Sequence, residues 1–102
     1  MSRVIYNKKS FDTGRKTVPA AGTAVKLHDD LPIPDGFMLI LKALDGNTGD
    51  IEIANTQEKA QSSDVFILDA GESIGLSIAN ANLVWIDATV SGEGVVWYVE
   101  RH

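Results

Sequence analysis

The chain has 102 residues, of which 44% are hydrophobic and 23% are charged, and it contains no cysteine. This length supports one small domain with one hydrophobic core, and the lack of cysteine excludes disulfide bridges, thiolate nucleophiles and cysteine metal sites. The net charge of -5 is unevenly distributed, because residues 1–26 carry six basic side chains and one acidic side chain, whereas residues 27–102 carry three basic and thirteen acidic ones. A basic N-terminal segment therefore precedes an acidic body.

The start of the chain has no apolar stretch of the kind found in secretory signals. The longest apolar run, at 37–41, is far shorter than the roughly 20 residues that cross a bilayer. We therefore expect a chain that is made in the cytosol and has no membrane partner.

After residue 20, apolar residues alternate with polar ones or form short runs between turn residues. This pattern predicts seven β-strands, at 23–27, 37–44, 50–54, 65–68, 73–78, 83–90 and 95–99. The strand at 37–44 is expected to be buried on both faces, and the turn at 45–49 is expected to join it to 50–54 as a hairpin. Residues 55–63 are expected to hold one helical turn at most. The predicted fold class is all-β, an antiparallel, jelly-roll-like β-sandwich of about seven to eight strands that occupies residues 21–102.

Residues 1–20 differ from this body because their few bulky apolar side chains are scattered among polar ones. Such a segment buries too little apolar area to offset its conformational entropy alone. It is either a frayed terminus or an arm that becomes ordered by adding a strand to the sheet edge of a neighbouring subunit or another partner. We favour the arm, since a tail without a partner has little use for bulky apolar residues. The residues expected to contact the partner are Arg3, Ile5, Tyr6, Lys8, Lys9, Phe11, Arg15 and Lys16.

Catalytic and metal-binding constellations are not recognisable in the sequence. A general base has to be held in place by packing, but the two histidines are His28, beside an acidic turn, and the terminal His102. Two histidines also fall short of a cupin-like metal site. The sequence Gly-Glu-Ser-Ile-Gly at 71–75 lies between two predicted strands, whereas a nucleophile elbow joins a strand to a helix. We therefore expect no enzyme, no cofactor and no metal ion.

Three aromatic residues near the C-terminus indicate an alternative function. Trp85, Trp97 and Tyr98 belong to the last predicted hairpin, and alternation could place Trp85 and Trp97 on one sheet face. Such a platform could stack on sugar rings, so a carbohydrate-binding β-sandwich module is the alternative, against aromatic packing in the core. Nucleic acid is not expected as a partner, because the acidic body repels phosphates.

Six short motifs follow one another between residues 18 and 99: AGTAV at 21–25, IPDG at 33–36, KALDGNTGDI at 42–51, LDAGESI at 68–74, VWIDA at 84–88 and SGEGV at 91–95. In this order and spacing they resemble a group of small virion proteins of tailed bacteriophages, over about four fifths of the chain. The resemblance implies a non-enzymatic structural protein that decorates or joins capsid or tail subunits. It also implies homo-oligomers, partners such as the major capsid protein, and location in the virion after synthesis in the bacterial cytoplasm. The basic arm does not match the pattern.

Overall fold

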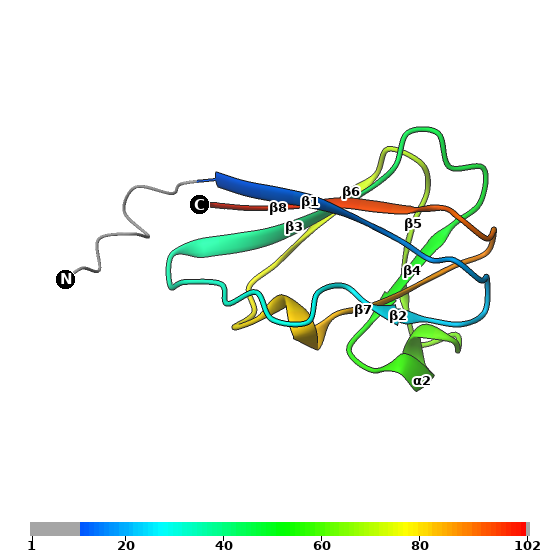
Figure 1. The fold of residues 1–102 in the computed structure, drawn as a ribbon, viewed down its shortest axis with the longest axis horizontal. Coiled ribbons are helices and arrows are strands. Elements are labelled where there is room, and N and C mark those ends of the chain that lie inside the picture. Colours follow the sequence, from blue (N-terminus) through cyan, green and yellow to red (C-terminus); the bar gives the residue numbers. More distant parts are fainter. Residues whose placement is uncertain (1–10, 102) are drawn as a thin grey trace.

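The computed structural model describes residues 11–101 and contains two four-stranded antiparallel sheets (Figure 1). The first sheet has the order β1-β8-β3-β6, formed by Phe11–Thr17, Gly94–Arg101, Phe37–Ala43 and Ser73–Leu76. The second has the order β2-β7-β4-β5, formed by Val25–Lys26, Trp85–Ala88, Ile51–Ala54 and Phe66–Leu68. The predicted all-β sandwich is confirmed.

The two halves of the chain pair strand by strand. β1 pairs with β8, β2 with β7, β3 with β6 and β4 with β5, and further pairings of β3 with β8 and of β4 with β7 complete the two sheets. Among consecutive strands, only β4 and β5 lie in one sheet. The predicted hairpin around 45–49 and the predicted final hairpin are therefore wrong, because both turns carry the chain from one sheet to the other. Turn residues mark a reversal of the chain, but they do not specify which sheet receives the next strand.

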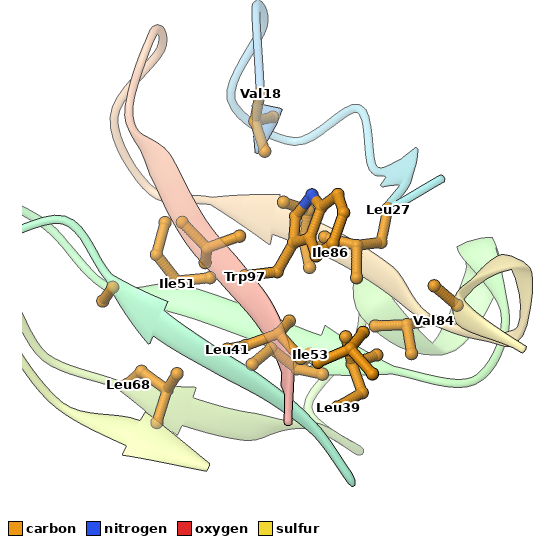
Figure 2. Packing of buried hydrophobic residues seen from close by; sticks show 14 of the residues in the cluster. Val18, Leu27, Leu39, Leu41, Ile51, Ile53, Leu68, Val84, Ile86 and Trp97 are labelled. Carbon is orange, nitrogen blue, oxygen red and sulfur yellow. The ribbon is translucent and has the colours of Figure 1, made fainter. Parts of the chain in front are cut away.

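The core lies between the sheets, where Leu39, Leu41 and Trp97 of the first sheet meet Ile53 and Ile86 of the second (Figure 2). Burial alternates along β3, so its outward residues are half-buried rather than buried. The expectation that this strand is buried on both faces is wrong, because nothing among the described residues forms a third layer over the first sheet.

Residues 11–17, which the sequence assigned to the arm, form β1 and pair with β8 along their whole length. Val18 is fully buried. The sandwich therefore includes Phe11 instead of starting at residue 21. The sequence hides this strand because its core-facing positions hold Asp12, Gly14 and Lys16 instead of apolar residues, so the alternation that marks a strand is missing. Residues 1–10 lie outside the described part of the chain.

Two short helical segments complete the fold. Thr56 caps α2, Gln57–Ala60, by accepting a hydrogen bond of 3.1 Å from the Lys59 backbone, which confirms the expected single turn. The 3₁₀ segment η1, Ala81–Leu83, leads into β7. Within residues 11–101, no helix has the length and apolar character needed to cross a bilayer.

Candidate functional site: an apolar groove between β5 and β6

A groove of about 700 Å³ opens between the two sheets, on the side where β6 is the edge strand of the first sheet and β5 is the edge strand of the second. We call it the β5–β6 groove. Its apolar lining comes from three parts of the chain. The second sheet contributes Ile53 and Phe66, and the end of β6 and the segment after it contribute Leu76 and Ile78. The segment before β7 contributes Leu83 and Val84. Asn55, Lys59, Ser63 and Asp64 contribute polar groups. The size and lining are those of a site that binds an apolar partner.

Phe66 is the decisive residue of this groove. It pairs in register with Ile53, whose side chain is 2% exposed and belongs to the core. Partners in register point to the same face of a sheet, so Phe66 also faces the interior of the sandwich. Nevertheless its side chain is 62% exposed. The first sheet leaves this core-facing ring uncovered, and Leu83, also in the groove, is 51% exposed.

The opposite face of β5 is apolar as well. Ile67 is 55% exposed and stands beside Glu52 on the outer face of the second sheet. β5 is an edge strand, so the backbone groups on its outer side have no neighbouring strand among the described residues. Apolar side chains on both faces of an unpaired edge make β5 suited to receive another strand.

Acidic side chains surround β5. Asp64 precedes the strand, Asp69 follows it, and Glu52 lies across from Ile67. The pKa of Glu52 is raised by burial and by the charges of Asp87 and Asp50. The pKa of Asp69 is raised by a hydrogen bond with the Asp50 side chain and by the charge of Asp50. Nearby carboxylates contribute to both shifts, although burial is the largest cause for Glu52 and the hydrogen bond with Asp50 is the largest cause for Asp69.

The aromatic residues proposed for sugar stacking are not brought together. Trp97 is 6% exposed and packs in the core (Figure 2). Its ring centroid lies 5.7 Å from that of His28 in an edge contact. Trp85 lies in the other sheet and holds the Lys26 Nζ 5.6 Å from its ring centre. Tyr98 is half-buried and points to the opposite face of β8 from Trp97. A platform formed by all three is therefore excluded by the sheet arrangement.

The residues predicted to contact a partner fall into two groups. Arg3, Ile5, Tyr6, Lys8 and Lys9 lie outside the described residues. Phe11, Arg15 and Lys16 lie in β1, at the edge of the first sheet that is farthest from β6. Of these, Arg15 is exposed and Lys16 is half-buried.

The groove was not predicted from the sequence, although one signal of it is present. The run Val-Phe-Ile-Leu at 65–68 has four consecutive apolar residues, which is typical of a strand buried on both faces. At a sheet edge the same run instead exposes two large side chains. Within residues 11–101, no group of three histidine, cysteine, aspartate or glutamate side chains is arranged to hold a metal ion.

Comparison with known proteins finds no match to this chain among protein-family models, curated proteins or solved structures.

Proposed function

We propose that this chain is a non-enzymatic structural protein of a tailed-bacteriophage virion, which self-associates and decorates or joins capsid or tail subunits. The observation that carries the binding role is the exposure of Phe66, a core-facing aromatic residue at an unpaired sheet edge. The virion assignment is supported by the order and spacing of the six motifs. We also propose that the two sheets form a jelly roll, since β1 to β4 pair in turn with β8 to β5.

A comparison of two sheet edges supports the location of the binding surface. β1 is also an edge strand, but Thr13 and Arg15 make its outward face polar, which discourages pairing with another chain. β5 exposes Phe66 and Ile67 instead. Burying one such side chain in an interface contributes roughly 1.5–3 kcal/mol. β5 and the groove beside it are therefore the surface through which we expect subunits to associate.

The carbohydrate-binding alternative required Trp85, Trp97 and Tyr98 on one surface. The core position of Trp97 removes its ring from any exposed platform, and Trp85 belongs to the opposite sheet. No described contact favours this alternative, so we propose a single function.

Particle composition tests the virion assignment. Phage particles that encode the chain are purified on a density gradient and analysed by quantitative mass spectrometry beside the soluble lysate. We expect the chain in the particle fraction at a fixed ratio to the major capsid protein. Finding it only in the soluble lysate, with particles complete, would contradict the proposal.

A further inference from the structure

We propose that the β5–β6 groove binds residues 1–10 of a second copy of this chain. The inference rests on the self-association proposed above and names the segment that enters the groove. Three independent properties of the groove and the segment support it: apolar complementarity, charge and reach.

The segment has apolar residues that suit the apolar lining of the groove. The segment contains Val4, Ile5 and Tyr6 in succession, three residues with high β-strand propensity. Beside β5 they would form a further strand of the second sheet, with its backbone paired to the open edge. Alternate side chains of that strand would then point into the groove and cover Phe66, while the others would lie on the outer face beside Ile67.

The charges are opposite. Residues 1–10 carry Arg3, Lys8 and Lys9 and no acidic side chain. Asp64 and Asp69 flank β5 in the sequence. Glu52, on the neighbouring strand β4, stands beside Ile67. Complementary charges of this kind speed association and fix the register of the partner.

The reach of the chain favours a second copy over the segment's own groove. β1 begins at Phe11, and the order β1-β8-β3-β6 places two strands between it and β6. The segment would have to cross about 14 Å of sheet and the roughly 10 Å between the sheets. The six residue-to-residue steps from Ile5 to Phe11 span about 20 Å when fully extended, so crossing to its own β5 would use nearly all of that length. Donation to a neighbour has no such constraint.

Disulfide trapping in the full chain tests this inference, because the chain has no cysteine of its own. Ile5→Cys protein and, in parallel, Tyr6→Cys protein, whose substituted side chains lie on opposite faces of a strand, are each mixed with differently tagged Leu83→Cys protein, equilibrated and oxidised. Leu83 is suited to the substitution because it lines the groove and is half exposed. The matched control replaces Leu83→Cys with Val90→Cys, a 40% exposed position two residues beyond the C-terminal end of β7. We expect the mixed disulfide with Leu83→Cys to exceed that with Val90→Cys by at least about tenfold, since docking raises the effective concentration of the thiol.

Three outcomes would overturn the inference, and they can be told apart. Equal trapping at Leu83→Cys and Val90→Cys, with self-association intact, would show that the segment does not bind the groove, without contradicting the proposed function. Trapping only within single Ile5→Cys/Leu83→Cys chains shows that the segment occupies its own groove. A full chain that stays monomeric at all concentrations would contradict both the proposed self-association and this inference.

The self-association of charge-reversal variants of the full chain provides a second test. Lys8→Glu/Lys9→Glu is expected to weaken self-association at low salt, with the difference decreasing at high salt. Arg15→Glu/Lys16→Glu makes the same change of charge on β1 and is expected to leave self-association near that of the original chain. Equal weakening by both pairs would show a general charge effect and contradict docking at β5.

Discussion

The carboxylate of Glu93 binds Thr48 twice, accepting hydrogen bonds of 2.7 Å from its backbone N–H and 2.9 Å from its hydroxyl group. It also accepts a hydrogen bond of 2.9 Å from the backbone N–H of Gly49. In return, the Asn47 side chain donates to the Gly94 carbonyl oxygen at 2.9 Å. Two of the six motifs, at 42–51 and 91–95, are therefore bonded to each other at the end of the sandwich.

Other motifs are joined in the same way. Asp87, from the motif at 84–88, accepts a 2.9 Å hydrogen bond from the backbone of Gly22 in the motif at 21–25. Ala43 exchanges backbone hydrogen bonds with Gly71 and Glu72 of the motif at 68–74. Apart from the motif at 84–88, which is largely β7 itself, these motifs contain the turns that carry the chain from one sheet to the other. The groove residues Phe66, Leu76, Ile78 and Leu83 lie between the motifs.

Replacing Glu93 tests the bond between the two turns. Glu93→Gln is expected to lower the melting temperature at pH 7, because the amide has one acceptor oxygen for three donors. The hydrogen bonds from Thr48 and Gly49 lower the pKa of Glu93, so its contribution to stability is present above the unfolded-state pKa and is lost as the pH falls through the lower folded-state value. The difference between the two proteins should therefore decrease in acid. Glu100→Gln on β8 is the control, and a constant difference at all pH values would contradict the linkage.

Asp87 is the one buried charged residue among residues 11–101, with 2% exposure. Asp87→Ala leaves the Gly22 backbone N–H without its acceptor and is expected to cost about 1–3 kcal/mol of unfolding free energy. Asp87→Asn keeps an oxygen in the same place and should cost less. Chemical denaturation measures both. An alanine variant as stable as the original chain would show that this bond does not hold the 19–24 segment.

Gly14 tests whether β1 belongs to the sandwich. A Cβ atom at this position would lie 2.5 Å from Cζ2 of Trp97, so Gly14→Ala is expected to cost roughly 1–3 kcal/mol through overpacking. Gly46→Ala is the matched control, because a Cβ atom there meets nothing within 4 Å. Unfolding free energies from denaturant titration give the comparison. If both variants are equally stable, β1 does not pack against Trp97.

Glu52 gives the opposite pH dependence to Glu93. Its pKa is raised by burial, Asp87 and Asp50, so its ionised form destabilises the fold above the folded-state pKa. Glu52→Gln is therefore expected to raise the melting temperature at pH 7. The gain should vanish as the pH falls below the ordinary pKa of 4.5. A loss of stability at pH 7 would show that the carboxylate makes favourable contacts that outweigh its burial.

The sequence predicted the fold class, the single helical turn and most strands, because alternation and turn residues are local signals. It did not predict β1, since Asp12, Gly14 and Lys16 at the core-facing positions give this edge strand the composition of a tail. It placed Trp85 and Trp97 in one hairpin, because a turn does not reveal a change of sheet. The exposure of Phe66 could not be predicted either, since it depends on the opposite sheet failing to cover that position.

We propose that subunits associate through Phe66 and the groove around it. Sedimentation velocity of the full chain, Phe66→Ser and Val90→Ser over a range of concentrations measures the contribution of this surface to association. Losing the burial of one phenylalanine, roughly 1.5–3 kcal/mol, predicts at least about tenfold weaker association for Phe66→Ser. Val90→Ser should associate like the original chain, and all three should share similar melting temperatures. Equal association of Phe66→Ser and the original chain would show that subunits do not associate through Phe66.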